Sequence, residues 1–585
     1  MATPVARPRA RRGNKHLALN RFGGAALAAG LALVVYLNAL LVPFVYDDQE
    51  TVVLNPSIVD LSNVRFILSH SPFRPVVNAS YALDHAIWGH TPFGYHLTNV
   101  LLHATLVVLL FLFLRRACAD ARVRMGGSGE PQSMDDWIAF GGAVLFAMHP
   151  LMSEGVAYVS GRSELLCGVF VVSTLLIARA AIARGGALWL AAGITALLAV
   201  LSKEVGLVLP VVLLAYDWLL VPGDPAIRRR RTWFVFVPCV ILLAVVAVYR
   251  LSVAAGPLSA EAPLLNLWTQ SIVIWRYLRL FFVPVGQSIM HAVHAVTSLA
   301  DPKALLALGG LAGLLGVGTA LRRRAPLTSF GIFWFLVVIA PSSSVVALRE
   351  GMAEHRAYLA SAGVVMALAG VASASRRLST RERPGVLAVA TLAIVCTLLG
   401  VMTAARNELW KDPARLWREA ISRAPEMWEP HYALGDTLRG SGDCAGAVAE
   451  YETVVRMRPY NLNAHTNLGI CLAQTNRITE AEAAFHRALE IDPRFARGYT
   501  NLGALALFTG QPERARDMYL RALEIEPGNA LALMQLAGLY ENVFKDFHAA
   551  ARMCGEARAA APTTPNVAEC VERNQRLAAA QDAGK

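Results

Sequence analysis

Long apolar runs recur along the first two thirds of this chain, and they restrict its fold more than any other feature. Each run approaches the roughly 20 residues that a helix needs to cross a bilayer, and the runs stop near Ala404. Because only helices and closed barrels satisfy their backbone hydrogen bonds in lipid, the runs predict membrane-spanning helices. Several runs are short, and the region 138–222 allows another division. We expect eleven spans, at about 24–46, 95–114, 138–150, 164–183, 187–201, 205–222, 232–252, 303–321, 326–346, 357–375 and 384–404.

The composition excludes several other classes of protein. Hydrophobic residues make up 55% of the chain and charged residues only 16%, whereas soluble domains carry about 25% charged residues. Apolar residues this abundant exclude a disordered chain, and the eight cysteines show neither CxxC pairs nor zinc spacing. The net charge of +12 comes largely from arginine clusters between apolar runs. That pattern orients a polytopic membrane protein and argues against a nucleic-acid partner.

The positions of these clusters predict an orientation. The N-terminal segment 1–23 and the clusters at 115–124, 228–231, 322–324 and 376–383 all reach the cytoplasm if the spans number eleven. This arrangement requires the segment 268–284 to stay outside as an amphipathic or re-entrant helix. The first apolar run has no cleavage site after it and is kept as a membrane anchor. Ser128 is then expected in the cytoplasm and Gly440 outside it.

A repeat begins where the apolar runs end. The pair Leu-Gly recurs at 434, 468 and 502, and matching alanine, aromatic and proline positions recur with the same spacing of 34 residues. This period and pattern are typical of tetratricopeptide (TPR) repeats, which stack helix-turn-helix units into a solenoid. We expect a half-repeat from about Glu408, three regular repeats, a divergent repeat after Gln535 and a polar capping helix near 565–580.

The first helices of such repeats line a concave face. Asn467, Asn501 and Gln535 share one position on it, with Ala433 at the same position one repeat earlier. Amide side chains offer both a donor and an acceptor and can bind a peptide backbone without reading its sequence. An amide in this position can equally serve to pack neighbouring repeats, and the sequence alone does not separate the two roles.

Two adjacent acids, Asp47 and Asp48, follow the first predicted span. A carboxylate at the membrane surface can act as a general base toward a hydroxyl nucleophile if burial raises its pKa. The alternative is an ordinary solvated loop. Two adjacent acids are too few ligands for a divalent metal, so we expect no metal and no cofactor, although a divalent metal is not excluded.

Other ionisable and aromatic residues lie in the segments expected outside the cytoplasm, where such residues are functional candidates. Cations at headgroup depth can hold a lipid phosphate, and the candidates are Arg356, Arg349, Lys203 and Arg276. The candidates for substrate contact are Arg74, His149, Glu154, Arg162, Glu164, Glu204, Glu354, His355 and Tyr358. Structural roles are the alternative, since Lys203 and Glu204 can neutralise each other and aromatic residues can be interfacial anchors. Gly309 and Gly313 are expected to allow close packing between spans.

Taken in order, these motifs resemble a known family. The acidic pair is followed by Phe73-Arg74-Pro75-Val76, Tyr95-His96-Leu97-Thr98-Asn99, His149-Pro150, Glu154-Gly155-Val156-Ala157, Gly161-Arg162-Ser163-Glu164, Lys203-Glu204, Tyr216-Asp217, Glu354-His355-Arg356-Ala357-Tyr358-Leu359 and the repeats. This order is similar to that of the transmembrane-and-TPR-containing (TMTC) protein O-mannosyltransferases and their bacterial relatives, which have the GT-C fold.

The resemblance implies an inverting transfer of a sugar, expected to be mannose, from a polyprenyl-phosphate donor to a Ser or Thr hydroxyl outside the cytoplasm. Asp47 or Asp48 would be the catalytic acid residue of the first loop. His355 stands where many relatives have another residue. The repeat array here is short for a long peptide-binding superhelix.

The sequence therefore predicts an all-α protein of three parts. These are a basic cytoplasmic N-terminus (1–23), a multi-span glycosyltransferase domain (24–405) and an extracytoplasmic TPR domain (406–585). The expected partners are membrane lipid, the lipid-linked sugar and a protein acceptor. The high alanine and arginine content suggests a bacterial cytoplasmic membrane, and an endoplasmic-reticulum membrane fits the same topology. The rival functions are a non-catalytic membrane-anchored TPR scaffold and a transferase acting on a glycan or lipid.

Overall fold

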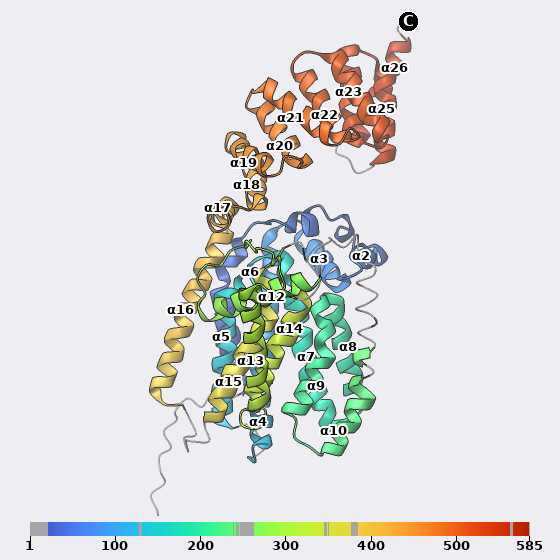
Figure 1. The fold of residues 1–585 in the computed structure, drawn as a ribbon. Coiled ribbons are helices and arrows are strands. Elements are labelled where there is room, and N and C mark those ends of the chain that lie inside the picture. Colours follow the sequence, from blue (N-terminus) through green and yellow to red (C-terminus); the bar gives the residue numbers. More distant parts are fainter. Residues whose placement is uncertain are drawn as a thin grey trace, which may run out of the picture. The chain divides into compact units, whose positions relative to one another are not determined.

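The computed structural model describes residues 21–127, 132–237, 239–241, 245, 263–343, 348, 350–375, 384–561 and 566–583. Within these residues every regular element is a helix, which confirms the all-α prediction (Figure 1). The chain forms two compact units, Met1–Asp412 and Pro413–Lys585. The predicted boundary at 405/406 falls inside the last helix of the first unit, and each unit is described by itself below.

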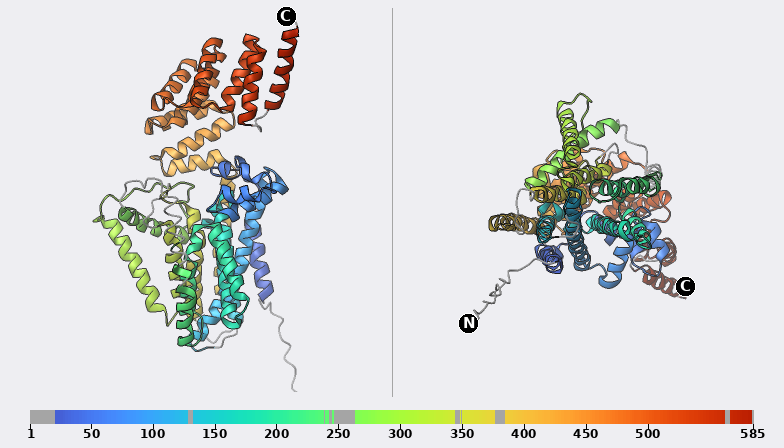
Figure 2. Two further views of the ribbon diagram at one scale, coloured as in Figure 1. Left: turned by 90° about the vertical axis from the view of Figure 1, so that its right-hand side faces the viewer. Right: turned by 90° about the horizontal axis from the view of Figure 1, so that it is seen from below.

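The first unit is a bundle of long apolar helices with shorter helices at its ends (Figures 1 and 2). The bundle contains α1 (Arg21–Val35), α4 (Pro92–Arg124), α5 (Ser133–Ala147), α7 (Arg162–Arg184), α8 (Leu188–Ser202), α9 (Leu209–Leu219), α13 (Pro302–Leu321), α14 (Pro326–Ile339), α15 (Tyr358–Ser375) and α16 (Val386–Trp410). The shorter or peripheral helices are α2 (Val64–His70), α3 (Pro75–Trp88), α6 (Ser153–Ala157), α10 (Pro225–Arg231) and α12 (Pro263–Phe282). In Figure 1, α2, α3 and α6 gather at one end of this unit and α10 lies at the other.

Among the described residues, six helical segments are long and apolar enough to cross a membrane: Phe22–Leu41, Pro92–Arg124, Val159–Arg184, Pro302–Leu321, Glu354–Ser375 and Val386–Trp410. Few residues of α13 and α16 are buried, as expected of helices that face lipid. The helices α5, α8 and α9 occupy three further predicted spans but have only 15, 15 and 11 residues. Most of the predicted span 232–252 lies outside the described residues. The chain is a membrane protein.

The segment that we expected to be amphipathic is the helix α12, which packs on α13. The Trp275 indole donates to the Ala307 carbonyl at 3.0 Å, and the Trp268 indole donates to the Leu299 carbonyl at 3.0 Å. These bonds hold α12 against the start of α13 and the loop before it.

α4, the longest described helix of the bundle, contributes to a polar cluster near its C-terminal end. Its 33 residues span about 50 Å at 1.5 Å per residue, so its ends lie on opposite sides of a hydrocarbon core of roughly 30 Å. Near its C-terminal end, the buried Asp120 accepts from Arg179 at 2.7 and 2.8 Å and from Tyr216 at 2.9 Å. Because a buried charge is costly unless it is paired, this cluster fixes α4, α7 and α9 together.

The same end of α4 is also linked to α5. Arg115 forms an ion pair with Asp136, and Arg122 pairs with Asp135 at 2.5 Å. Two of the arginines that predict a cytoplasmic loop are thus also fixed contacts within the unit.

Glycines bring α14 and α15 into backbone contact. A Cβ atom at Gly363 would lie 2.6 Å from the Gly331 carbonyl oxygen, and one at Gly370 would lie 2.2 Å from the Thr328 nitrogen. By contrast, a Cβ at Gly309 or Gly313 would meet nothing within 4 Å. Our expectation that Gly309 and Gly313 allow close span packing is therefore wrong, because these residues lie on a face of α13 that has no close neighbour among the described residues.

The second unit is built from helix pairs, as the 34-residue period predicts. Its helices are α17 (Pro413–Arg423), α18 (Trp428–Gly440), α19 (Cys444–Met457), α20 (Leu462–Gln474), α21 (Ile478–Ile491), α22 (Ala496–Phe508), α23 (Pro512–Ile525), α24 (Ala530–Leu539), α25 (Phe547–Ala560) and α26 (Val567–Ala583). The half-repeat that we expected from Glu408 begins at Pro413 instead, since Glu408 still belongs to α16. A disulfide between Cys554 and Cys570 joins α25 to α26.

In each regular repeat, a glycine of the first helix packs against an aromatic residue of the second helix. A Cβ at Gly435, Gly469 or Gly503 would lie 2.5 to 2.8 Å from the aromatic ring 16 residues later. The rings belong to Tyr451, Phe485 and Tyr519, which are buried. Glycine in the first helix of each repeat therefore makes room for an aromatic side chain of the second helix.

Candidate active site

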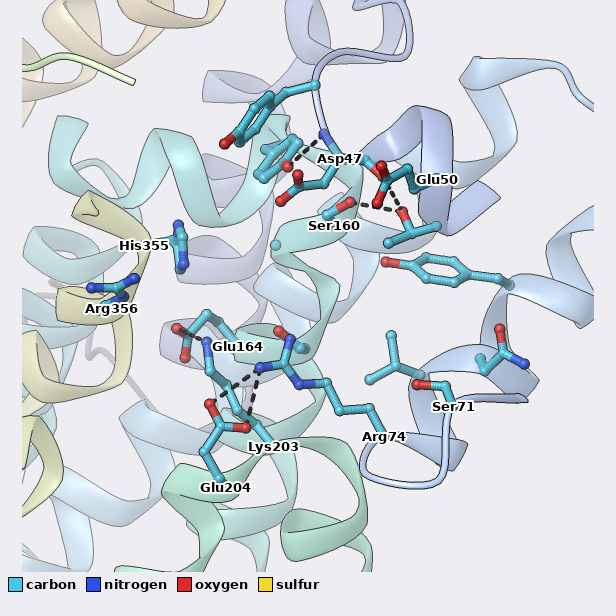
Figure 3. A pocket seen from close by; sticks show the side chains of 18 of the residues that line it. Asp47, Glu50, Ser71, Arg74, Ser160, Glu164, Lys203, Glu204, His355 and Arg356 are labelled. Atoms are coloured by element: carbon cyan, nitrogen blue, oxygen red, sulfur yellow. Dashed lines mark hydrogen bonds and ion pairs between the residues drawn. The ribbon is translucent and has the colours of Figure 1, made fainter. Parts of the chain in front are cut away.

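A cavity of about 630 Å³ opens in the first unit and is lined mainly by polar and charged side chains (Figure 3). Its walls come from the loop after α1, the N-terminal end of α3, the turn before α7, the break between α8 and α9, and the segment before α15. Among the predicted site residues, those that line it are Asp47, Arg74, Glu164, Lys203, Glu204, His355 and Arg356. Residues about 300 positions apart in the sequence thus share one pocket.

The two adjacent acids of the first loop have different surroundings. Asp47 lines the cavity, and its backbone N–H donates to the Tyr158 hydroxyl at 3.1 Å. Asp48 is buried and accepts from the Val45 N–H at 3.1 Å and from the Ser160 N–H and hydroxyl at 2.8 and 2.7 Å. Burial raises the pKa of Asp48 to about 7, although these hydrogen bonds oppose the rise.

The backbone before these acids has an unusual conformation. Tyr46 has a φ of +56°, a left-handed value that is uncommon for a residue with a side chain. Its hydroxyl donates to Glu350 Oε1 at 3.2 Å, which links the first loop to the segment before α15. Strained residues of this kind often occur at functional sites, and here the strained residue directly precedes the acid that lines the cavity.

Among the described residues, three cations line the cavity, and each is paired with a carboxylate. Arg74 binds both oxygens of Glu204, at 3.1 and 3.2 Å, and both side chains are more than 40% exposed. Lys203 pairs with Glu164, and both are nearly buried. The Arg356 Nη2 lies 3.6 Å from Glu350, whose carbonyl also accepts from Nη1 at 2.7 Å.

The position of Lys203 and Glu204 follows from a break in the helix. α8 ends at Ser202, and Lys203 is extended with φ −159° and ψ 147°. A Cβ at Gly206 would lie 2.6 Å from the Ala199 backbone, so only glycine lets the chain fold back this closely on α8. The apolar run is therefore interrupted where its two charged residues reach the cavity.

His355 is held by a buried carboxylate. Its Nδ1 lies 2.5 Å from Glu154 Oε1, and the other oxygen of Glu154 accepts from the Glu354 N–H at 3.2 Å. Burial, together with repulsion from Glu354, raises the pKa of Glu154. Glu154 lies behind the cavity wall and orients a ring that lines the cavity.

Several predicted site residues do not line this cavity. The His149 ring stacks on Phe281 with centroids 4.5 Å apart, and its Nδ1 accepts from the Leu151 N–H at 3.1 Å. The Tyr358 hydroxyl lies 2.6 Å from Nδ1 of the buried His103. Both aromatic residues fix contacts between helices.

The predicted arginines Arg162 and Arg276 are also bound elsewhere. Arg162 pairs with Asp84 at 2.6 Å and donates to Asn99 at 2.9 Å. Arg276 donates to the Ala292 carbonyl at 2.8 Å. Arg162 therefore joins α3, α4 and α7 beneath the cavity, and Arg276 holds the loop after α12.

Glu354 accepts from the Ser288 N–H at 2.7 Å, from the Gln287 amide at 2.8 Å and from the His291 ring at 2.8 Å. It thus fastens the loop after α12 to the segment before α15. The remaining candidate, Arg349, lies outside the described residues.

Several lining residues were not predicted from the sequence, among them Asn55, Asn78, Tyr158 and Ser160. Tyr158 and Ser160 lie between two of the recognised motifs and were detectable there. Asn55 donates to Asn78 at 2.9 Å, a contact across 23 residues that no spacing rule predicts. Among the described residues, no group of three or more His, Cys, Asp or Glu is placed to hold a metal ion.

The amide residues of the second unit differ from one another. The Asn467 amide donates to the Tyr432 hydroxyl at 3.0 Å and to Asp436 at 2.9 Å, contacts that join neighbouring repeats. Gln535 is exposed, whereas Asn501 is partly buried. These contacts give Asn467 a role in packing neighbouring repeats. A peptide-binding role for Asn467, Asn501 and Gln535 remains a prediction.

Comparisons with known proteins identify the repeats and several relatives of the chain. Two tetratricopeptide-repeat families match residues 432–494 and 496–529. A protein O-mannosyl-transferase of Caenorhabditis elegans, F38B6.6, is 25% identical over 458 residues, covering 73% of this chain and 62% of that protein. The human protein O-mannosyl-transferase TMTC2 is 30% identical over 210 residues, covering 33% of this chain and 23% of that protein.

A solved structure of a TPR protein, TTC0263 of Thermus thermophilus, is 18% identical, covers 31% of this chain and 96% of its own, and has a TM-score of 0.26. The present chain spans less than two thirds of the length of the two O-mannosyl-transferases. The chain is nevertheless TMTC-like, because its curated homologues are protein O-mannosyl-transferases of this type and tetratricopeptide repeats form its C-terminal unit.

Proposed function

We propose that this protein is an integral-membrane glycosyltransferase that moves a mannose from a polyprenyl-phosphate donor to a Ser or Thr hydroxyl of an extracytoplasmic protein. One observation carries the proposal: the pocket places a carboxylate, Asp47, together with three cations, Arg74, Lys203 and Arg356. A transfer from a lipid phosphate needs a base for the acceptor hydroxyl and positive charge for the leaving phosphate. The names of the homologous O-mannosyl-transferases support the choice of sugar and acceptor.

In the proposed reaction, Asp47 takes the proton of the acceptor hydroxyl while the hydroxyl oxygen attacks the anomeric carbon of the sugar. The bond between that carbon and the phosphate oxygen breaks, and its electron pair stays on the lipid phosphate. Attack opposite the leaving group inverts the anomeric configuration. We assign the base to Asp47 and not to Asp48, because Asp47 lines the cavity whereas Asp48 is buried and does not line it.

The cations would bind the donor phosphate by exchanging partners. Each of Arg74, Lys203 and Arg356 is bound to a carboxylate in the free protein, so each is held in place before a ligand arrives. A phosphate accepts charge-assisted hydrogen bonds from the same cations as a carboxylate, and the charge that grows on it as the bond breaks strengthens them. His355, oriented by Glu154, lies beside Arg356 and would contact the sugar or the acceptor.

The second unit would bind the acceptor or another protein, since peptide binding on a concave face is the usual use of such solenoids. We place it on the same side of the membrane as the cavity, as the arginine distribution predicts. In this arrangement the bundle carries out the transfer and the repeats select the protein that is modified.

The test uses the purified full-length protein in lipid nanodiscs with a polyprenyl-phosphate mannose labelled in the sugar, and it follows release of the lipid phosphate and transfer of label to Ser- and Thr-containing peptides. The wild type is expected to do both, and Asp47→Asn neither. The matched control is Asp60→Asn, since Asp60 is exposed, belongs to the same loop region and does not line the cavity.

Equal activity in the wild type and Asp47→Asn would overturn the assignment of the base. Label in a glycan or lipid but in no peptide would support the rival acceptor. No release of lipid phosphate with any polyprenyl-phosphate sugar would leave the scaffold as the better function.

A further inference from the structure

Two cysteines from neighbouring repeats lie side by side in the second unit. Cys444 is the first residue of α19, Cys471 lies within α20, and their Sγ atoms are 2.8 Å apart across 27 residues of sequence. A disulfide has an Sγ–Sγ distance of about 2.05 Å. A movement of under about 1 Å, within the range of side-chain adjustment, would therefore bring the two sulfurs to bonding distance.

The surroundings of the pair fit a cross-link better than a reactive thiol or a metal site. Both side chains are buried, and burial raises the pKa of the Cys471 thiol, whereas reactive cysteines are accessible and have a lowered pKa. The nearest polar partner is the Gln474 amide oxygen, 2.8 Å from Cys444 Sγ. Among the described residues no further metal ligand joins the pair.

The same unit already contains one disulfide, between Cys554 and Cys570. Disulfides form and persist in oxidising compartments and are rare in the cytosol. A unit that folds where one of its cysteine pairs is oxidised exposes its other pair to the same oxidant. Oxidation of these cysteines does not depend on the cavity or on the reaction proposed for it.

We propose that Cys444 and Cys471 form a second disulfide, which ties the second helix of one repeat to the first helix of the next. The oxidant is a protein or small-molecule disulfide of the compartment. One cysteine thiolate attacks the donor disulfide to give a mixed disulfide, and the second thiolate then displaces the donor thiol. Two thiols are oxidised to one disulfide, the donor disulfide is reduced to two thiols, and the two cysteine protons pass to the donor sulfurs.

The bond forms while the repeat is still open, because the folded unit buries both sulfurs. Repeats of a solenoid contact only their neighbours, so a covalent link between consecutive repeats restricts the hinge between them directly. The consequence is a stiffer start to the solenoid, with α19 and α20 unable to separate.

The first experiment maps the cysteines of the full-length protein. Free thiols of the denatured, unreduced protein are alkylated, and the protein is digested and analysed by mass spectrometry. We expect a cross-linked peptide that contains Cys444 and Cys471, a second one with Cys554 and Cys570, and label on Cys118, Cys167, Cys239 and Cys396. Quantitative label on Cys444 and Cys471 would overturn the proposal, whether or not Cys554 and Cys570 are joined.

The second experiment measures backbone amide hydrogen exchange of α19 and α20 in a Cys554→Ala/Cys570→Ala background. A disulfide is lost completely when either sulfur is removed, so C444A, C471A and the double variant should all exchange faster than the background, by a similar factor of roughly ten or more. Effects of the single changes that add up in the double variant indicate two separate thiols and would overturn the proposal.

Discussion

Neighbouring residues with the same side chain can have unrelated tasks, and Asp47 and Asp48 show this. Asp47 faces the cavity. Asp48 accepts three hydrogen bonds, and the two from Ser160 fix the first loop to the turn before α7. The sequence identifies the pair but not which acid faces the cavity. The direction of each side chain depends on the left-handed backbone at Tyr46, and because this residue is not a glycine, the sequence does not indicate that conformation.

The first prediction at this scale concerns Asp48. Its pKa in the folded protein, about 7, lies above the ordinary value of 3.8, so the folded state holds an extra proton between these values. Stability should therefore fall as the pH rises from about 4 to about 7, by at most roughly 1.4 kcal/mol per pH unit, and stay level above that. Thermal unfolding in detergent across this range measures the slope.

Asp48→Asn removes the titrating group and should flatten that part of the profile, while Asp60→Asn should leave it unchanged. If the stability of the wild type instead rises between pH 5 and 7, the hydrogen bonds, and not burial, determine the charge of Asp48.

The second prediction concerns the phosphate-binding cations. Arg356→Ala should raise the KM for the lipid-phosphate donor by about 10- to 100-fold, the size expected for losing a hydrogen bond to a charged group, because the phosphate charge exists before and during the reaction. Steady-state kinetics with varied donor measure this, and Arg356→Lys should recover part of the loss. Arg65→Ala is the control, since Arg65 is exposed and does not line the cavity. An unchanged KM would remove Arg356 from the donor site.

At the scale of elements, the contact between α14 and α15 matters most for the site, because α15 begins two residues after Arg356. The sequence contains many glycines in its apolar runs, and spacing favoured Gly309 and Gly313. The structure uses Gly331, Gly363 and Gly370 instead. Which glycines face another helix depends on the partner helix, and a single helix pattern does not contain that information.

The third prediction follows from this contact. Gly363→Ala places a methyl group 2.6 Å from a backbone oxygen, so the helices must separate, at a cost of roughly 1–3 kcal/mol as in other overpacked cores. Thermal unfolding in detergent should show a clear loss, and donor binding should weaken because the segment before α15 shifts. Gly313→Ala adds the same methyl group where nothing lies within 4 Å and should leave both quantities unchanged. Equal effects of the two changes would contradict the close contact.

At the scale of the whole molecule, the apolar runs and the 34-residue period were sufficient to predict an all-α membrane bundle followed by TPR repeats. Both signals are periodic and are repeated many times along the chain, so local errors do not remove them. The pocket was only partly predictable. The sequence motifs identify segments that form the pocket. The burial of Arg162, Glu354 and Tyr358, however, depends on contacts between distant helices that no local pattern encodes.

The fourth prediction concerns the two units. A variant that ends at Asp412 should insert and fold, because the first unit is compact by itself and its helices bond their own backbones. Release of lipid phosphate should then continue, while transfer to the protein acceptor should fall. Loss of donor binding in a well-expressed truncated protein would show that the repeats belong to the catalytic machinery.

The paired cations of the cavity have a consequence for acid–base balance, which supplies the fifth prediction. Partial burial raises the pKa of Glu204, and Arg74 and Lys203 together lower it to about 2. When a lipid phosphate takes over those cations, the released carboxylate loses its counter-charge beside a new anion and should bind a proton from the buffer. Donor binding is then a proton-consuming step that weakens as the pH rises. Calorimetric titration at one pH in buffers of different ionisation enthalpy should detect this uptake, Glu204→Gln should reduce it, and identical binding heats in all buffers would contradict the exchange of partners.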